Sequence, residues 1–239
     1  MNNNFLIICL AGKGTRFLDA GYKTPKFFLP IKGSLVISLI IEEIKLSFTG
    51  KIILVVNDFY LNFDDTFFNL EKKYNLEKTL YIKDTNGQAE TATIALNSIK
   101  STVGSFALFN GDTIIKNRNL DLLFERIQIN SLDGLIDCFN SISNKYSYIK
   151  YQNNIVLDIV EKKVISNYAT SGLYLFSSKK DFLNAFNCIK KDKEIYISSI
   201  YKELISNKKK FTFNLEENKN NTIVLGTPRQ YVQFIKNKK

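Results

Sequence analysis

The sequence contains no histidine. This excludes serine–histidine and cysteine–histidine catalytic pairs, histidine-ligated metal centres and acid–base catalysis by an imidazole. Any catalysis by this chain must depend on carboxylates, Lys and Arg side chains, backbone amides and a bound metal ion.

Cysteine is scarce, and long apolar runs are missing. Cys9, Cys138 and Cys188 lie far apart in apolar surroundings, so we predict three reduced, buried thiols and neither a disulfide framework nor a zinc site. No apolar run approaches the roughly 18 residues of a membrane-spanning helix. Met1–Asn4 also lacks the basic start of a signal peptide. We therefore expect a soluble, cytoplasmic protein with no membrane partner.

Arginine is scarce as well, with four among the 33 basic residues. The formal net charge of +10 comes mostly from scattered lysines, and only Lys208–Lys210 and the last residues cluster. A nucleic-acid-binding protein typically shows a basic stripe with arginine and aromatic residues, so we expect no nucleic-acid partner. The excess positive charge would still attract small anionic molecules.

Apolar residues make up 45% of the 239 residues and follow a regular pattern in the first half of the chain. Short runs rich in β-branched or aromatic residues predict strands at Phe5–Leu10, Ile52–Val56, Thr79–Ile82, Phe106–Phe109 and Leu135–Phe139. Amphipathic segments between them predict helices at Ser34–Leu46, Leu61–Tyr74, Gln88–Ile99 and Asn119–Gln128. This alternation predicts an α/β fold, with a Rossmann-like, mostly parallel sheet and helices on both faces.

The pattern changes after residue 140, where strands become more frequent. Further elements are predicted in the order strand, strand, strand, helix, helix, strand and helix, at Tyr146–Tyr151, Ile155–Val160, Gly172–Phe176, Lys180–Ile189, Glu194–Ser206, Phe211–Leu215 and from Pro228 onward. The first two flank a polar turn, as in a hairpin. Because no linker or repeat separates the halves, we expect a single domain over residues 1–239.

The first candidate site follows the first predicted strand, where parallel α/β sheets bind ligands. The chain reads Leu-Ala-Gly-Lys-Gly-Thr-Arg-Phe over Leu10–Phe17, followed by Thr24-Pro25-Lys26. Two glycines allow a tight turn that presents N–H groups to a phosphate, and Arg16 and Lys26 add cations. The segment lacks the ends of a Walker loop and of a dinucleotide-binding fingerprint. Taken alone, it could also be a simple turn.

Two further segments combine turn-forming and polar residues. Thr85–Glu90 opens a predicted helix, where Thr85 and Gln88 could form a capping box. Phe109–Thr113 places Asp112 after an Asn-Gly turn at the end of an apolar strand. A carboxylate in this position could hold a metal ion.

The last two motifs lie in the second half. Glu161-Lys162 precedes the apolar strand that ends at Phe176, and Gly226-Thr227-Pro228 enters the final helix with proline in the first turn. Each of these motifs is ordinary by itself.

Together, in this order and over nearly the full chain, the five motifs resemble the nucleotidyltransferase family that makes nucleotide-activated sugars and related phosphocompounds. The resemblance implies a GT-A-like nucleotidyltransferase fold. Residues 1–140 would bind an NTP, and residues 141–239 would bind a small phosphorylated acceptor. A nucleoside monophosphate would be transferred and pyrophosphate released. Arg16 and Lys26 would neutralise phosphate charge, and Asp112 would hold Mg²⁺ or Mn²⁺.

The resemblance also implies binding residues. Those for the nucleotide are Leu10, Ala11, Gly12, Lys13, Gly14, Thr15, Arg16, Gly87, Gln88, Asn110 and Gly111, with Gln88 reading the edge of the base. Those for the acceptor are Glu161, Lys162, Thr170, Gly172, Asn144 and Tyr148, with Lys162 on the acceptor phosphate. Many family members carry a second metal-binding aspartate where this chain has Val224. Either one carboxylate suffices, or Glu216 or Glu217 takes its place.

Several alternatives stay open at this point. A sugar 1-phosphate for a surface polysaccharide is the favoured acceptor, and a CTP-dependent cytidylyltransferase for phosphocholine or phosphoglutamine is the alternative. A metal-dependent glycosyltransferase would show two aspartates flanking one residue after a strand, a pattern that Asp112 does not have. Because of Val224, a non-catalytic nucleotide-binding module is a further alternative. The sequence leaves open the base, the acceptor and whether the chain forms a homo-oligomer.

Overall fold

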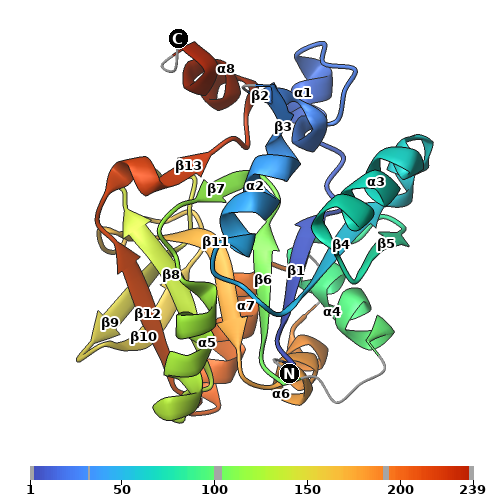
Figure 1. Cartoon of the computed structure of the whole chain (residues 1–239). Coiled ribbons are helices and arrows are strands. Elements are labelled where there is room, and N and C mark those ends of the chain that lie inside the picture. The colour runs from blue at the N-terminus through green and yellow to red at the C-terminus, as the bar shows by residue number, and fades with distance from the viewer. Residues whose placement is uncertain (1–2, 32, 100–103, 191–193, 237–239) are drawn as a thin grey trace.

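A computed structural model describes residues 3–31, 33–99, 104–190 and 194–236 of the chain. Within these ranges, nine strands form one mixed sheet with helices on both sides (Figure 1). The order along its main path is β10-β9-β11-β6-β1-β4-β5, and β8 and β12 continue the sheet beside β11.

Parallel pairing dominates the first half of the sheet. There β1 (Phe5–Leu10) lies between β4 (Lys51–Asn57) and β6 (Phe106–Asn110), and β5 (Lys78–Ile82) lies beside β4. The second half adds β8 (Gly134–Asn140), β9 (Tyr148–Gln152), β10 (Ile155–Val160), β11 (Tyr168–Phe176) and β12 (Phe211–Glu216). Of these, β11 runs antiparallel to both β6 and β8, and β12 runs parallel to β8. The predicted mixed, mostly parallel sheet is confirmed.

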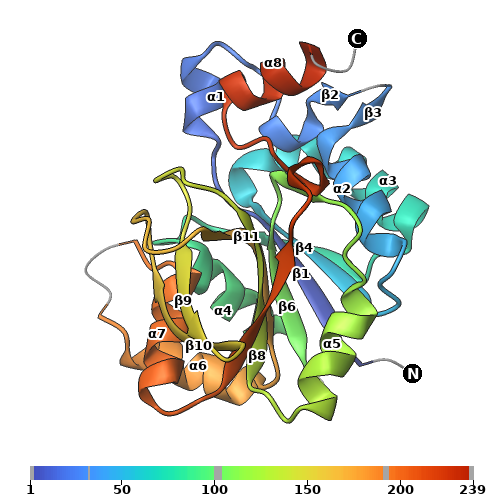
Figure 2. The same ribbon diagram turned by 90° about the vertical axis from the view of Figure 1, so that its left-hand side faces the viewer.

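Both faces of the sheet are buried under helices, as Figure 2 shows from the side. Leu6, Ile8 and Leu10 of β1 belong to the core on one face, and Phe5 and Ile7 belong to the core on the other. The first face packs against α2 (Val36–Lys45), α3 (Asp64–Tyr74) and α5 (Leu120–Ile129). The second packs against α4 (Gln88–Ser98), α6 (Lys179–Cys188) and α7 (Ile197–Ser206). Two buried faces explain why these strands are apolar throughout rather than alternating.

Three predicted helices begin two or three residues later than expected. Ser34–Leu35 forms β3, which pairs with β2 (Pro30–Ile31), so α2 begins at Val36. The start of the helix predicted over Leu61–Tyr74 lies in a 3-10 helix, Asp58–Phe63, and α3 begins at Asp64. The helix predicted from Glu194 begins only at Ile197, which leaves Glu194–Tyr196 outside it.

The short elements that the sequence analysis missed include α1 (Thr15–Asp19), β7 (Thr113–Ile115) and β13 (Thr222–Val224). Through them the C-terminal part of the chain lies next to α1. Strand β13 pairs antiparallel with β7, and α8 (Pro228–Lys236) lies beside α1 (Figures 1 and 2). The ring centroid of Tyr231 is 6.5 Å from that of Phe17 and 6.2 Å from that of Tyr22. The last motif therefore lies next to the glycine loop.

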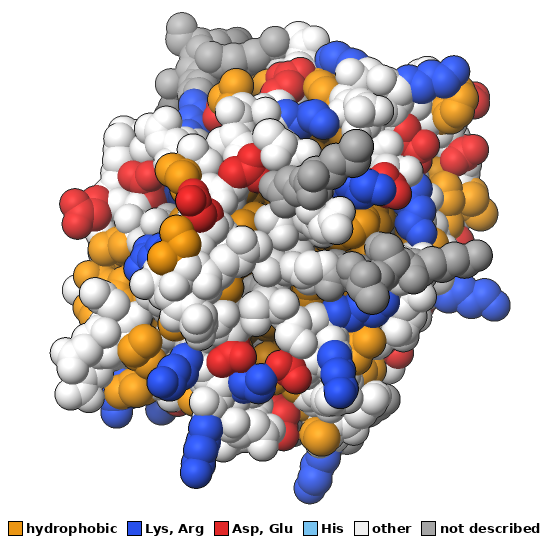
Figure 3. Space-filling view, turned by 60° about the horizontal axis from the view of Figure 1, so that its bottom comes forward, with side chains coloured by type: hydrophobic (Ala, Val, Ile, Leu, Met, Phe, Trp, Pro, Cys, Tyr) orange, Lys and Arg blue, Asp and Glu red, His pale blue; other side chains and the backbone are white. Residues whose placement is uncertain are grey.

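Charge is dispersed on the face that Figure 3 shows, where Lys and Arg side chains alternate with Asp and Glu side chains. No basic stripe crosses this face. In the part of the chain that the structure describes, no helix has the length and apolar character needed to cross a membrane.

The cysteines differ in exposure. Cys138 is buried and Cys9 is half-buried, whereas Cys188 is exposed at the last residue of α6. The prediction of a buried thiol is therefore wrong for Cys188, because the apolar residues around it in the sequence turn to the core while Cys188 faces solvent. Among the core residues of α6 are Phe182, Ala185 and Phe186.

Candidate functional site

A cleft opens at the carboxyl ends of β1 and β6, where the fold class predicts ligands. It consists of two adjoining cavities of about 530 and 540 Å³, which share Gly12, Lys26, Gln88, Asn110, Asp112 and Glu194. The cavity of 540 Å³ extends over Thr85–Gln88 and is called the helix chamber below. The cavity of 530 Å³ extends over Glu161 and Lys162 and is called the hairpin chamber.

The glycine loop connects the two chambers. Gly14 has a φ of 65°, a left-handed conformation that glycine adopts without strain, and it is the N-cap of α1. Gly12 differs, because a Cβ atom there would meet no protein atom within 4 Å. The packing of the protein thus does not require a glycine at position 12. Its bare backbone lines both chambers, which favours close approach of a ligand over a purely structural turn.

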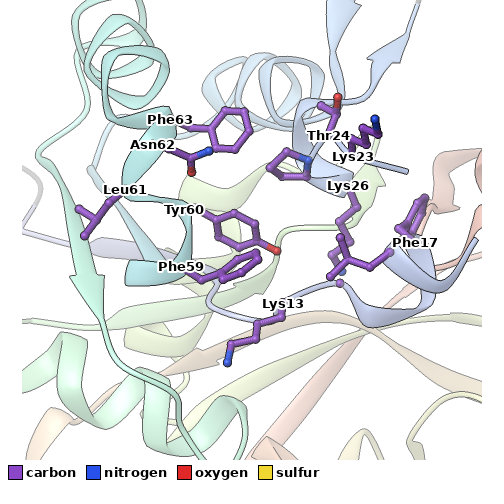
Figure 4. Close-up of a pocket in the computed structure, with 13 residues that line it drawn as sticks. Lys13, Phe17, Lys23, Thr24, Lys26, Phe59, Tyr60, Leu61, Asn62 and Phe63 are labelled. Carbon is purple, nitrogen blue, oxygen red and sulfur yellow. The ribbon is translucent and has the colours of Figure 1, made fainter. Parts of the chain in front are cut away.

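The rings of Phe59, Tyr60 and Phe63 lie beside the glycine loop and are called the aromatic wall below. A smaller hollow of about 320 Å³ lies there (Figure 4), and it shares Lys13, Gly14 and Lys26 with the hairpin chamber. Tyr60 lies in the middle of this wall, with its hydroxyl toward the Lys26 side. That hydroxyl donates a hydrogen bond of 3.3 Å to the carbonyl oxygen of Gly12. The loop carbonyl is thereby tied to a buried ring.

Lys26 and Asp112 meet at the junction of the chambers. The Lys26 Nζ donates to the Asp112 Oδ2 at 2.6 Å, and the two side chains are 20% and 22% exposed. The turn before Asp112 depends on Gly111, because a Cβ atom there would lie 1.9 Å from the Leu10 Cδ2. The buried Leu10 side chain thus supports this turn and does not line either chamber.

The environment of Asp112 favours its ionised form. Burial by itself would raise the pKa of this carboxyl, but the Lys26 ammonium, the Thr113 hydroxyl and the charge of Arg16 outweigh it and hold the pKa below its ordinary value. Arg16 is exposed and lines the hairpin chamber. An ionised carboxylate is a ligand that Mg²⁺ prefers, and one or two carboxylates suffice where substrate phosphates complete the shell. Asp112 therefore fits a magnesium ion.

The structure gives Asp112 no second acidic partner from the expected positions. Val224 of β13 pairs with Thr113 and lines the hairpin chamber, so the position is adjacent but offers no metal ligand. Glu216 lies 3.5 Å from the guanidinium of Arg118, and neither it nor Glu217 lines the chambers. The hypothesis that one of these glutamates replaces the missing aspartate is therefore wrong. Among the described residues, no group of three or more acidic or cysteine side chains could hold a metal ion.

Gln88 lies at the start of α4 and points to β6. Its Nε2 donates to the Asn110 Oδ1 at 2.6 Å. The alternative of a capping box between Thr85 and Gln88 is wrong, because the N-cap is Gly87, with a φ of 121° and no capping side chain. Gly172 leaves room for this pair, since a Cβ atom there would lie 2.6 Å from the Asn110 Nδ2. Gln88 and Asn110 line both chambers, whereas Gly172 lines the hairpin chamber.

Glu161 and Lys162 follow β10 and face the hairpin chamber. The Glu161 Oε2 accepts hydrogen bonds from the hydroxyls of Ser147 and Ser198. The Lys162 Nζ donates to the Tyr196 hydroxyl at 2.8 Å and lies 4.6 Å from the centroid of its ring. Thr170 lines the same chamber, and its hydroxyl is 2.9 Å from that of Tyr174.

Further residues that were expected to bind the nucleotide also line the cleft. Ala11 and Gly87 line the helix chamber, Thr15 lines the hairpin chamber, and Lys13 lines the hairpin chamber while pairing with Asp84 at 2.6 Å.

Two expected acceptor residues lie outside both chambers. Asn144 is exposed on the segment before β9. Tyr148 is buried with 0% exposure, packs in a small cluster with Phe139 and Ala169, and donates from its hydroxyl to the Ser143 carbonyl. As the first residue of β9, it turns inward, and this inward orientation corrects the expectation that it borders a ligand.

The structure also adds residues that the sequence analysis missed. Those lining the hairpin chamber include Lys145, Tyr146, Ser147, Glu194, Tyr196 and Ser198. Glu194 and Tyr196 were placed inside a predicted helix, where nothing marked them as part of a site. No motif in the sequence signals them, and only the pairing of distant segments brings them into the cleft.

Known proteins resemble this chain in sequence and in fold. The bifunctional protein GlmU of Methanococcus aeolicus is 27% identical over 205 residues, which cover 83% of this chain and 46% of that protein. The chain thus spans about half the length of this curated relative. The crystal structure of a nucleoside-diphosphate-sugar pyrophosphorylase from Vibrio cholerae is similar, with a TM-score of 0.81, 25% identity and coverage of 97% of this chain and 99% of that one.

An inositol-1-phosphate CTP transferase from T. maritima shares the fold, with a TM-score of 0.76 at 14% identity over 98% of this chain and 95% of that one. The sequence profile that matches this chain describes nucleotidyl transferases and covers residues 6–231. These residues include all five motifs. The chain belongs to the nucleotidyl transferase family.

Proposed function

We propose that this chain transfers a nucleoside monophosphate from an NTP to a small phosphorylated acceptor and releases pyrophosphate. The observation that carries the proposal is the position of Lys26 and Asp112, where two chambers meet. The glycine loop and Lys162 both line the hairpin chamber, which includes this junction. Membership of the nucleotidyl transferase family supports the same reaction class and leaves the glycosyltransferase alternative without support.

The nucleotide would occupy the helix chamber and the glycine loop. Gly12 and Gly14 would bring backbone N–H groups to the phosphates, and Arg16 would contribute a positive charge from α1. Gln88, held by Asn110, would contact the edge of the base. The acceptor would occupy the hairpin chamber, with its phosphate on Lys162 and its body near Glu161 and Thr170.

The reaction needs no general base. The second pKa of a phosphate monoester is about 6, so the acceptor is largely ionised at neutral pH. One of its oxygens would form a bond to the α-phosphorus, and the bond from that phosphorus to the bridging oxygen of the β-phosphate would break. The main obstacle is repulsion between two anions. Lys26 and Arg16 would offset this repulsion and the charge that develops on pyrophosphate.

Asp112 would hold the metal ion, with Val224 leaving the neighbouring position without a ligand. When bound, Mg²⁺ would supply further charge neutralisation at the α-phosphate. A single protein carboxylate is compatible with this role, because the phosphates of the NTP and water supply the other ligands. Mn²⁺ has the same preference for carboxylate oxygens.

A sugar 1-phosphate is the acceptor that we favour, for the synthesis of a surface-polysaccharide precursor. The nucleoside-diphosphate-sugar pyrophosphorylase of Vibrio cholerae, with which this chain shares 25% identity over nearly its whole length, supports a sugar acceptor. The hairpin chamber adds carboxylate and hydroxyl groups, from Glu161, Ser147 and Thr170, that can bind sugar hydroxyls.

Pyrophosphate release in the presence of Mg²⁺ tests the proposal. CTP, UTP, dTTP, GTP and ATP are crossed with glucose 1-phosphate, N-acetylglucosamine 1-phosphate, phosphocholine and phosphoglutamine. We expect release with one NTP that depends on a sugar phosphate. Release only with CTP and a non-sugar phosphate would replace the sugar acceptor by the cytidylyltransferase alternative. A folded protein that binds an NTP but releases no pyrophosphate with any acceptor would contradict the proposed reaction.

A further inference from the structure

The segment Glu194–Tyr196 lies in the cleft wall directly before α7. It contacts both chambers: Glu194 lines the helix chamber and the hairpin chamber, and Tyr196 lines the hairpin chamber. The segment carries no motif and has no role in the site as described so far.

Backbone hydrogen bonds attach this segment to the loop before α4. The Ile195 N–H donates to the Asn86 carbonyl at 2.6 Å, and the Ala89 N–H donates to the Ile195 carbonyl at 3.1 Å. The fit between them is close, since a Cβ atom at Gly87 would lie 2.7 Å from the Ile195 carbonyl oxygen. The loop that precedes Gln88 thus fixes the place of residues 194–196.

From that place, Tyr196 holds the ammonium group of Lys162. The Lys162 Nζ donates to the Tyr196 hydroxyl at 2.8 Å, and the ring lies under the same ammonium, 4.6 Å from centroid to nitrogen. The Tyr196 hydroxyl in turn donates to the Glu194 carboxylate. Lys162, Tyr196 and Glu194 therefore form a directed chain, in which each donor is oriented by the next acceptor.

The backbone of Lys162 lies in a tight turn. Its φ is 54°, a backbone conformation that residues other than glycine rarely adopt, and its backbone N–H donates to the Tyr146 carbonyl. A lysine side chain has considerable rotamer freedom, and fixing it costs free energy. A partner that already holds the ammonium group lowers this cost when a phosphate binds.

We propose that Tyr196 is a positioning residue for the acceptor phosphate, acting through Lys162. The inference rests on the proposed function and extends it, because it links Lys162, the cation that would bind the acceptor phosphate, to the loop that precedes Gln88. An ammonium group has three donors, so Lys162 can bind a phosphate and keep its bond to Tyr196. Charge supports the arrangement: the bond to Tyr196, with the nearby carboxylates of Glu161 and Glu194, raises the pKa of Lys162 and keeps it cationic.

The variant Tyr196→Phe tests this role, because it keeps the ring and removes only the hydroxyl. We expect the KM for the acceptor to rise about tenfold, the usual order for losing one hydrogen bond to a charged group, while kcat and the KM for the NTP stay within twofold of wild type. The assay uses the NTP and acceptor pair that gives the fastest pyrophosphate release in the crossed panel. The matched control is Tyr151→Phe, which changes a tyrosine of β9 that lines neither chamber.

A double-mutant cycle separates positioning from general damage to the fold. If Tyr196 acts through Lys162, then Tyr196→Phe has no further effect on the acceptor KM in a Lys162→Ala background. An unchanged acceptor KM in Tyr196→Phe, an equal rise in both KM values, or a full effect in the Lys162→Ala background would overturn the inference. Wild-type protein that releases no pyrophosphate would instead overturn the proposed function, and the inference with it.

Discussion

The Nζ of Lys26 lies 2.6 Å from the Oδ2 of Asp112, so a lysine expected to face phosphates holds the carboxylate expected to face a metal ion. Both groups are only about one-fifth exposed, with side-chain exposures of 20% and 22%. The two groups form an ion pair, and Lys26 helps to hold the pKa of Asp112 below its ordinary value. A divalent cation at Asp112 and Lys26 at the same oxygen repel one another.

Lys26→Met should therefore change catalysis and metal binding in opposite directions. We expect kcat to fall by about 10²–10³, the usual cost of one preorganised charge at a transition state. Binding of Mn²⁺ to the protein without nucleotide should tighten, because the Asp112 carboxylate loses its internal cation. Steady-state kinetics and electron paramagnetic resonance of free Mn²⁺ measure the two effects. Lys23→Met, on the same segment but outside both chambers, is the control. Weaker Mn²⁺ binding in Lys26→Met would contradict this account.

Arg16→Ala should lower kcat by about 10²–10³ while the protein stays folded. Arg16 is exposed at the start of α1 and has only a long-range electrostatic effect on Asp112, so its removal leaves no buried group unpaired. Pyrophosphate release and thermal unfolding are measured in parallel. Arg229→Ala, an exposed arginine outside both chambers, controls for the loss of one positive charge. Turnover near the wild-type rate in Arg16→Ala would remove Arg16 from the mechanism.

Val224→Asp should lower the Mg²⁺ concentration needed for half-maximal rate by several-fold. Val224 faces Thr113 across the β7–β13 pair, next to Asp112, so a carboxylate there adds a second oxygen ligand. In Val224→Asn the side chain has nearly the shape of aspartate but no charge, so the Mg²⁺ dependence should stay close to that of wild type. A titration of initial rate against Mg²⁺ compares the three proteins. Equal half-saturation in all three would mean that position 224 lies outside the metal's reach.

Arg118→Met should destabilise the fold by about 3–5 kcal/mol, because it leaves a buried carboxylate without its cation. The side chains of Arg118 and Asp137 are 1% and 0% exposed, with 3.2 Å between Nε and Oδ2. Arg118 also donates to the Asn221 carbonyl, just before β13. Urea unfolding measures the loss. Arg126→Met, which removes a less buried arginine on α5, should cost less, and an equal loss in the two variants would count against the buried pair.

Much of the fold could be predicted because its strands and helices are long and periodic. Phe5–Leu10 was predicted to the residue, since a run buried on both faces is apolar throughout and ends at a glycine loop. The short β7 and β13 escaped, because a strand of three residues has no period of its own. Helix α7 was extended too far, because Glu194–Tyr196 continues its pattern in the sequence but pairs with the loop before α4.

For the candidate site, too, some residues could be predicted from the sequence and others could not. Residues in compact motifs, such as Gly12, Arg16 and Asp112, could be found because their chemistry is local to one loop. Tyr196 could not, because its partner Lys162 lies 34 residues away in the chain. Tyr148 was assigned to the wrong side of its strand, since a tyrosine suits either face of a hairpin.

The most direct test of the central claim follows a radioactive phosphate group from the NTP into the products. The NTP is labelled with ³²P at either the α- or the γ-phosphate, and the products formed with the best acceptor of the crossed panel are separated. Transfer of a nucleoside monophosphate predicts that the α label appears in an acceptor-linked product and the γ label in pyrophosphate, each only when the acceptor is present. A γ label on the acceptor, or an α label released as free nucleoside monophosphate at a rate independent of the acceptor, would contradict it.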